Sequence, residues 1–400
     1  MNSAFSFLPT WPDTVAPVLQ AGVLLLAAGL SGEFAWRKWR LPRASAYGVI
    51  GLLAGLLGGV SLAPTVRDMA RTVLDVALGL LLFELGSRLS LRWIRNNPWL
   101  IVTSLAEASL TFVLVWLGLR ALGCDAMVSS IAAGIAISTS PSVVVHVRGE
   151  LRSEGQVTER LMTLAALNSA YAVIVVKLVS AGLHQVFYGN AFASILQPLY
   201  LIAGSLALAW LLARAGNLLF RHLPPRDDPS SVAMLGLVLT TIGLTAIFKL
   251  SVVLTLLAAG ILFKNAVARP QLWTSGFGAI GGLLTVVLFV LTLLPVEGGD
   301  FVVGGVGALI LILARLLAKT VAVTGLARPS GIAWRQGAAL SLCLMPMSAL
   351  ALVLAEETYD LYPGISPSLR AIVMVAIVVL QLGGPLLVAR SLAVCGERAD

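Results

Sequence analysis

The sequence predicts an all-α polytopic membrane protein of about thirteen transmembrane helices. Three observations carry this prediction. Of the 400 residues, 58% are hydrophobic and only 12% are charged, and the mean hydropathy is +0.95. Long apolar runs recur along the whole chain, and polar segments containing proline interrupt two of them in opposite halves. Water-soluble domains of this length do not normally combine these properties.

Each apolar run is roughly 17 to 25 residues long, which is enough for a helix to cross about 30 Å of hydrocarbon. The predicted spans begin near Val15, Tyr47, Ala70, Pro98, Ala126, Val157, Ala191, Ser230, Ser251, Gly276, Phe301, Trp334 and Ser368. Polar residues intrude in the fifth, sixth and twelfth spans, so their bounds are the least sharp.

The basic residues alternate from loop to loop, which predicts the orientation. Bases follow the odd-numbered spans, as with Arg37, Arg92 and Arg148, whereas Glu297 and Asp300 mark an intervening loop. The positive-inside rule then places the odd-numbered loops and the C-terminus in the cytoplasm and the N-terminus outside. This pattern explains the net charge of +8 without a nucleic-acid partner, and makes the lipid bilayer the expected surroundings.

Nothing in the sequence predicts a cleaved leader, a metal site, a cofactor or a soluble regulatory domain. The first apolar run lacks a basic n-region and has no small-residue cleavage site after Leu30, so we expect a retained helix. Cys124, Cys343 and Cys395 are too widely spaced for a metal or redox motif. Because the last apolar run extends almost to Asp400, a single transmembrane domain is expected over residues 1–400.

The two interruptions, at Ser138–Ser142 and Met345–Ser348, are the best pointers to a site. Proline removes a backbone donor and clashes with the preceding turn, so Pro141 and Pro346 should break their helices. Irregular backbone at membrane depth survives only beside protein or a water-filled cavity. Broken helices at corresponding positions of two inverted repeats present their half-helix ends to a shared ion or substrate site. One interruption alone would be weaker evidence for a binding site, because proline is common in transmembrane helices.

Few ionisable side chains lie within the predicted spans, and each costs at least a few kcal/mol there. They are Asp75, Glu84, Glu107, Lys177, Arg315 and Lys319. Glu107 is the most deeply placed acid, and Asp75 comes next. Arg315 and Lys319 are four residues apart, so both should point from one helix face into the interior as buried counter-charges. For Glu84 a surface ion pair with Arg88 competes with a functional role, as does snorkelling to the external surface for Lys177.

An ordered set of short motifs resembles the monovalent cation:proton antiporter superfamily, which includes bacterial sodium/proton exchangers and potassium-efflux antiporters. The matching segments are Leu41–Gly48, Gly79–Phe83, Ser138–Val144, Ala258–Leu262, Arg315–Lys319 and Leu344–Pro346. Each motif is weak alone, but together they follow the order of the family and cover nearly the whole chain.

The resemblance implies a homodimer in the plasma (inner) membrane of a prokaryote. It also implies rigid scaffold helices, mainly residues 14–86 and 230–294, a moving core, mainly 98–181 and 301–394, and a linker helix at 191–215. The broken helices would cross at mid-membrane, where a carboxylate would bind a cation and a proton in turn. Competition for one carboxylate is enough to couple the two gradients.

The sequence departs from the family in the sixth span. Members usually carry Asn-Asp or Asp-Asp there, whereas this chain has Asn168-Ser169, and serine cannot carry the exchanged proton. We expect Glu107 or Asp75 to substitute, with Thr139, Ser140, Asn168 and Ser169 supplying neutral oxygens. The predicted function is then secondary active exchange of Na⁺ or K⁺ for protons.

Two alternatives remain open from the sequence. The core is a proton-independent cation or anion pathway if Arg315 and Lys319 dominate an uncompensated site. The fold serves as a membrane sensor or assembly partner if transport has been lost. An enzyme is not expected, because no serine within a span has a suitably placed base and orienting acid.

Overall fold

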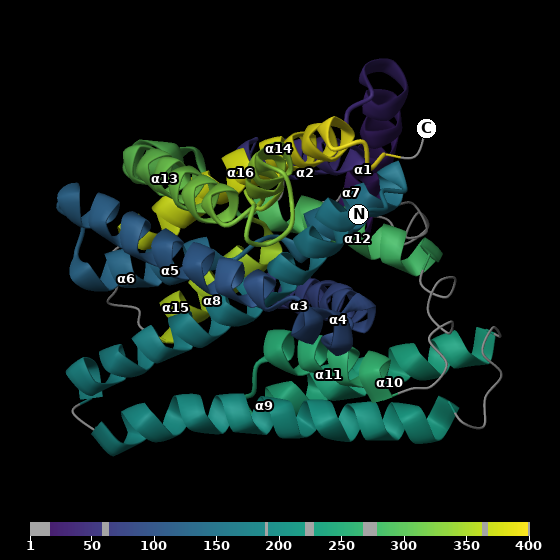
Figure 1. Cartoon of the computed structure of the whole chain (residues 1–400), viewed down its shortest axis with the longest axis horizontal. Helices are drawn as coiled ribbons and strands as arrows, with labels where there is room; N and C mark the ends of the chain where they lie inside the picture. Colours follow the sequence, from purple (N-terminus) through teal and green to yellow (C-terminus); the bar gives the residue numbers. More distant parts are fainter. Residues whose placement is uncertain are drawn as a thin grey trace, which may run out of the picture.

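The computed structural model of the chain describes residues 17–57, 64–188, 191–220, 228–266, 278–361 and 367–398, and these residues contain helices and connections without a strand. The helices lie side by side in a bundle, with α9 along one edge and α13 near the opposite edge (Figure 1). The predicted all-α class is therefore confirmed.

Helices form wherever the sequence is apolar and uninterrupted, and proline or glycine often stands where they begin or end. The first half contains α1 (Pro17–Trp39), α2 (Arg43–Leu56), α3 (Pro64–Arg88), α4 (Leu91–Asn96), α5 (Pro98–Ala121), α6 (Ala126–Ile137), α7 (Pro141–Leu151) and α8 (Gln156–Tyr188). The second half contains α9 (Ala191–Phe220), α10 (Asp228–Ile247), α11 (Val252–Ala266), α12 (Gly278–Leu293), α13 (Gly298–Lys319), the π-helical turn η3 (Thr320–Thr324), α14 (Trp334–Cys343), α15 (Ala349–Leu361) and α16 (Pro367–Val394).

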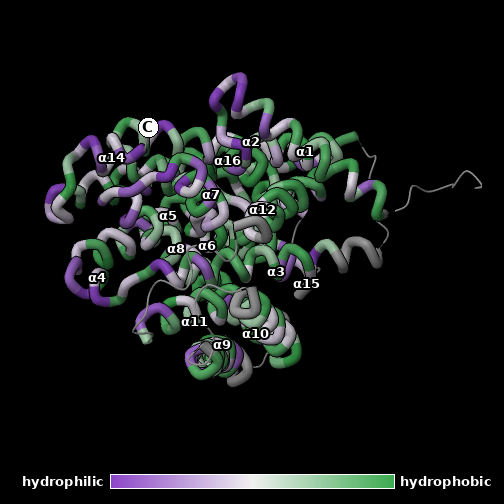
Figure 2. Tube along the Cα trace, turned by 90° about the vertical axis from the view of Figure 1, so that its right-hand side faces the viewer, coloured by the Kyte–Doolittle hydropathy of each residue, from purple (hydrophilic) through white to green (hydrophobic). Residues whose placement is uncertain are grey.

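The helices group into the thirteen expected spans. Seven described segments are long and apolar enough to cross a membrane, and α2, α10, α11 and α12 are shorter apolar helices. The two other expected spans coincide with α3 and the broken pair α14–α15, while α4 is too short to cross. Hydrophobic residues dominate the helices, whereas hydrophilic ones gather in α4 and near helix ends (Figure 2). The predicted starts at Val15 and Gly276 lie outside the described residues.

One group of helices consists of α1, α2, α3, α9, α10, α11 and α12. Within it α11 packs between α3 and α9, and α2 packs against α1 and α12. Glycines let α3 and α11 approach closely, since a Cβ at Gly86 would meet the Leu257 carbonyl oxygen and one at Gly260 would meet the Phe83 carbonyl oxygen. The backbones of α3 and α11 therefore touch directly.

A second group surrounds the two broken spans. In it α13 packs against α16 and α5, α5 against α6, and α6 against α8, while α14 and α15 both pack on α16. In the most apolar window of the broken span α6–α7, 89% of the residues are buried, compared with 17% for α1. The broken span is therefore at the centre of the protein, where its irregular backbone is enclosed by other helices.

Both proline-containing segments interrupt their helices as predicted. The first break separates Ile137 at the end of α6 from Pro141 at the start of α7, and the second separates Cys343 at the end of α14 from Ala349 at the start of α15. The breaks meet, because the Ser140 backbone N–H donates to the Pro346 carbonyl oxygen at 2.9 Å. The protein thus has two broken helices that cross.

Candidate functional site

Backbone and hydroxyl groups join the two breaks to each other. The Thr139 hydroxyl donates to the Leu344 carbonyl oxygen at 3.1 Å. Three serine hydroxyls cluster beside it, with 3.0 Å between Ser140 and Ser142 and 3.2 Å between Ser142 and Ser348. Ser140 also contacts Ser348, and its oxygen accepts from the backbone N–H of Val143 at 3.3 Å, which caps α7. The crossing is therefore a connected network of polar groups.

Arg315 compensates the carbonyl ends of the two half-helices that stop at the crossing. The last carbonyls of a helix have no partner within it and carry a partial negative charge. The Arg315 guanidinium, which is fully buried, donates to the carbonyl oxygens of Ala136, Ser138, Leu344, Met345 and Pro346. A planar group with five N–H donors suits this task. Arg315 thus holds the ends of α6 and α14 together.

Lys319 and Glu107 form a buried ion pair next to the crossing. The Lys319 ammonium contacts Glu107 Oε1, and neither side chain has any exposed surface. The ammonium also lies 3.5 Å from the Thr139 hydroxyl oxygen. The second carboxylate oxygen, Glu107 Oε2, has no hydrogen-bond partner among the described residues. A buried carboxylate with one unpartnered oxygen is unusual, because leaving it so is costly.

Helix α8 contributes two neutral side chains to the same place. The Asn168 Nδ2 group donates to the Thr139 hydroxyl oxygen at 3.1 Å, while Asn168 Oδ1 is buried without a partner in the described chain. The Ser169 hydroxyl lies 2.8 Å from the Ala165 carbonyl oxygen and 3.4 Å from that of Thr139. Thr139 therefore links α8, the first break and Lys319. We call Glu107, Thr139, Asn168, Ser169 and Lys319 the polar cluster.

The polar cluster offers the ligands that a small monovalent cation needs. Glu107 Oε2 supplies a carboxylate oxygen and Asn168 Oδ1 an amide oxygen, and both are free to accept. Serine and threonine hydroxyls add neutral oxygens to a cation site, and a carboxylate also binds a proton. The cluster can thus hold a cation or a proton at one carboxylate, although Ser169 itself cannot ionise.

Asp75 lies apart from the polar cluster. Its electrostatic neighbours are Arg71 on its own helix and Glu356 and Glu357 on α15. Glu357 in turn forms an ion pair with Lys177 at 2.7 Å. Of the two acids expected to substitute for the missing aspartate, the structure therefore brings only Glu107 to the crossing.

Two other charged residues in the spans have local explanations. Glu84 and Arg88 form the expected ion pair on α3 at 2.6 Å, with both side chains partly exposed. Lys177 bonds to Glu357 and does not simply extend to the surface. Among the described residues, the hydrogen bonds of Glu84 and Lys177 lead to Arg88 and Glu357 and not to the polar cluster.

Sequence reasoning missed four hydroxyl groups. Ser142 and Ser348 contact each other at the crossing. Both lie inside the predicted interruptions but were not among the expected site residues. Ser104 and Thr111 flank Glu107 on α5, and their hydroxyls are buried without a partner in the described residues. Their spacing of three and four residues from Glu107 was the available signal.

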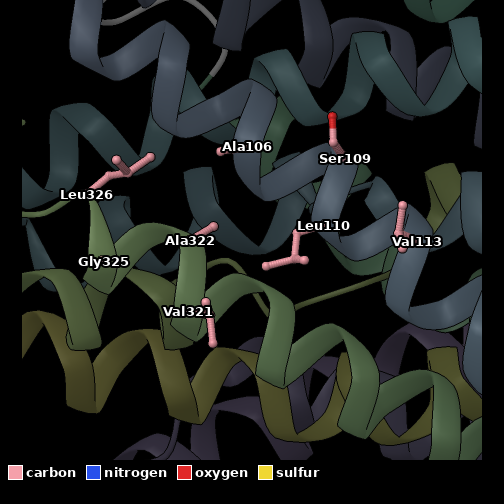
Figure 3. Close-up of a pocket in the computed structure, with 8 residues that line it drawn as sticks. All are labelled: Ala106, Ser109, Leu110, Val113, Val321, Ala322, Gly325 and Leu326. Atoms are coloured by element: carbon pink, nitrogen blue, oxygen red, sulfur yellow. The ribbon is translucent and has the colours of Figure 1, made fainter.

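A groove on the outer side of α5 is not part of the site. It has a volume of about 520 Å³ and is lined by Ala106, Ser109, Leu110, Val113, Val321, Ala322, Gly325 and Leu326 (Figure 3). No lining residue is ionisable, and seven of the eight are apolar or glycine. A groove of this kind suits lipid chains better than ions.

Comparison with known structures supports the same architecture. The chain is similar to two structures of the sodium proton antiporter MjNhaP1 from Methanocaldococcus jannaschii, with 15% sequence identity to each. One, determined at pH 8, has a TM-score of 0.69 over 94% of this chain and 95% of that chain. The other has a TM-score of 0.70 over 95% and 96%. At this identity the similarity shows the fold alone.

No curated protein matches the chain. A family model described as "Sodium/hydrogen exchanger, transmembrane" matches residues 22–392, nearly the whole sequence. This match agrees with the apolar helices, the crossed breaks and the buried charges beside them. The chain is therefore an integral membrane protein that belongs to the sodium/hydrogen exchanger family.

Proposed function

We propose that this protein is a secondary transporter that exchanges a monovalent cation, Na⁺ or K⁺, for protons, and that Glu107 binds the two in turn. One observation carries the proposal. Glu107 is fully buried at the crossing, with one oxygen paired to Lys319 and the other unpartnered in the described residues. Membership of a family of exchangers supports the same reading.

Competition at Glu107 couples the two flows. Ionised Glu107 attracts a cation, which Asn168 Oδ1 and the oxygens of Thr139 and Ser169 help to hold. Protonation removes the charge that attracts the cation, so the cation leaves. Each ligand therefore lowers the affinity of the other, which is the coupling that exchange requires. Arg315 keeps its carbonyl partners throughout and acts as a structural counter-charge.

This arrangement supplies the carboxylate from a different helix. The family's usual aspartate would stand at Ser169 on α8, whereas Glu107 belongs to α5. Both positions are connected to Thr139. The Ser169 hydroxyl lies 3.4 Å from the Thr139 carbonyl oxygen, and Glu107 is linked to the Thr139 hydroxyl through the Lys319 ammonium. Ser140 completes the neutral lining, and Pro141 and Pro346 keep the backbone open. We infer that the acid has changed helix while remaining in the same polar cluster.

An anion pathway has less support. That reading requires Arg315 and Lys319 to leave positive charge uncompensated at the crossing. In the described residues Lys319 is paired with Glu107, and Arg315 is surrounded by carbonyl oxygens. Lys319 is thus paired with a carboxylate and Arg315 with carbonyl dipoles, and the free oxygen of Glu107 is the anionic ligand that the described residues offer to a cation there.

The proposal also divides the helices into a moving core, a rigid scaffold and a linker. The helices that surround the crossing form the moving core, residues 98–181 and 301–394, and slide against scaffold helices in 14–86 and 230–294, with residues 191–215 as the linker.

The protein works as a homodimer in a prokaryotic plasma membrane, with its N-terminus outside and its C-terminus in the cytoplasm. Native mass spectrometry tests the dimer, since a monomer alone would contradict it. Protease access to tags at each terminus of oriented vesicles tests the topology.

Flux measurements in proteoliposomes test the exchange itself. With an imposed pH gradient, adding Na⁺ or K⁺ should collapse the gradient for the natural protein. Glu107→Gln should abolish the collapse while leaving the protein folded, because glutamine keeps the shape but binds no proton. Glu84→Gln is the matched control, since Glu84 pairs with Arg88 away from the cluster, and should retain exchange. Unchanged exchange in Glu107→Gln would falsify the assignment.

A further inference from the structure

The inner face of α5 carries three polar side chains with unpartnered oxygens. Ser104 Oγ, Glu107 Oε2 and Thr111 Oγ1 have no hydrogen-bond partner among the described residues, and all three side chains have no exposed surface. Residues three and four apart on a helix are neighbours on one face. Ser104 and Thr111 therefore stand one turn before and one turn after Glu107.

The missing partners set these hydroxyls apart from most buried hydroxyls in the described chain, where only those of Ser153, Thr255 and Thr324 also lack one. Buried hydroxyls in helices commonly bond to the carbonyl one turn earlier, as Thr103 does to Trp99 at 2.7 Å and Thr292 does to Leu288 at 2.6 Å. The hydroxyls of Ser104 and Thr111 make no such hydrogen bond in the described residues. Buried polar groups nearly always have a partner, so an unpartnered one calls for a water molecule or an ion.

Helix geometry spaces these three residues at distances that one or two water molecules can bridge. Along a helix, residues three or four apart are separated by about 4.5 to 6 Å. Two hydrogen bonds through one water oxygen span about 5.5 Å. Buried waters typically make about three hydrogen bonds to groups that otherwise lack partners. One or two waters on each side of Glu107 would satisfy Ser104, Thr111 and the free carboxylate oxygen.

We propose that ordered waters connect Ser104 and Thr111 to Glu107, and that this polar track along α5 relays protons to and from Glu107. In each step a hydroxyl oxygen accepts a proton from the water on one side and passes its own proton to the water on the other. No hydroxyl keeps a charge, and Glu107 takes up or releases the only net proton. This inference rests on the proposed exchange at Glu107.

The surroundings of α5 restrict the track to the protein interior. The inner face of α5 packs among α6, α8 and α13. The apolar groove of Figure 3 lies on another side of the same helix, where Ala106, Leu110 and Val113 face Val321 and Ala322. Ser104 is nearer the end at which α5 begins, and Thr111 is nearer the other end. Ser104 and Thr111 therefore extend the track from Glu107 toward opposite sides of the membrane.

Removing single hydroxyls from the full-length protein in proteoliposomes tests the relay. Ser104→Ala and Thr111→Val should each slow cation-driven proton flux by about tenfold, while equilibrium cation binding, measured by calorimetry, stays unchanged. The matched control is Thr103→Val, which removes a hydroxyl that is bonded to its own helix and should exchange at the natural rate. Ser104→Thr and Thr111→Ser retain a hydroxyl and should restore the flux.

The outcomes separate this inference from the function on which it rests. If Ser104→Ala and Thr111→Val exchange at the natural rate while Glu107→Gln is inactive, the relay is wrong and the exchange at Glu107 stands. If Glu107→Gln is itself active, the proposed function fails as well.

Silver ions provide a second measurement that does not depend on the stability of Ser104→Ala and Thr111→Val. In a protein whose Cys124, Cys343 and Cys395 are replaced, Ser104→Cys and Thr111→Cys place one thiol on the track. Ag⁺ should inhibit Ser104→Cys from the side where α5 begins and Thr111→Cys from the opposite side, and should spare Thr292→Cys, which places a buried thiol on α12. Failure of Ag⁺ to reach either thiol would overturn the inference.

Discussion

At the scale of single residues, Thr139 determines how the site is assembled. It donates to Leu344 across the crossing, accepts from Asn168 and lies near Lys319. Its hydroxyl therefore connects two breaks, α8 and the ion pair. The sequence predicts Thr139, Asn168 and Ser169 as site residues because they stand beside a proline break or at the family's aspartate position. Depth in the span ranks Glu107 ahead of Asp75, but the sequence does not show that Glu107 reaches them, because the direction of a side chain on α5 depends on packing against α13.

Restoring the family's acid tests the chemistry of the polar cluster. Ser169→Asp adds a carboxylate beside Thr139, so cation affinity should rise and exchange should shift to a different pH range, because a second acid now titrates in the site. Calorimetric cation titrations and flux measurements at several pH values check this. Ser153→Asp is a control, because Ser153 lies in the connection between α7 and α8. No change in either property would mean that Ser169 does not face the bound cation.

At the scale of helices, composition and proline account for most of what the sequence predicts. The broken spans follow from Pro141 and Pro346, because the missing donor and the ring clash act locally. Contacts between the breaks are harder to predict. Ser142 and Ser348 are 206 residues apart in sequence and touch only because two spans cross. The π-helical turn η3, directly after Lys319, contains no proline or glycine, so the sequence does not predict it.

The crossing of α3 and α11 gives a prediction at this scale. Gly260→Ala would press a methyl group against the Phe83 carbonyl oxygen, so the helices must separate. Overpacking of this kind typically costs about 1 to 3 kcal/mol, and thermal unfolding in detergent should shift to lower temperature. Gly236→Ala is the control, because no atom lies near its added Cβ. Equal stability of the two variants would show that the crossing can relax.

At the scale of the whole molecule, a salt bridge joins the two helix groups. Arg43, at the start of α2, pairs with Glu150 on α7 at 3.1 Å and with Glu33 on α1 at 2.9 Å. Helices α1 and α2 belong to the proposed scaffold and α7 to the proposed core. Sliding of one group against the other must therefore break or stretch this link. The sequence does not reveal such a contact, because the pairing depends on how the groups sit together.

The single carboxylate that the described residues place at the crossing also has an electrical consequence. Arg315 keeps its carbonyl partners, and we propose that Lys319 stays protonated whether Glu107 holds a cation or a proton, so that Glu107 is the one group that changes its occupant. One cation then replaces one proton, and the occupied site carries the same charge in both directions. A charge that crosses the membrane gains or loses about 2.3 kcal/mol per 100 mV, but here no net charge crosses. A valinomycin-imposed potential should leave the rate of Na⁺-driven exchange unchanged, whereas a voltage-dependent rate would require a second proton. The transporter would thus be powered by concentration differences alone, and the resting voltage of the cell would perform no work on it.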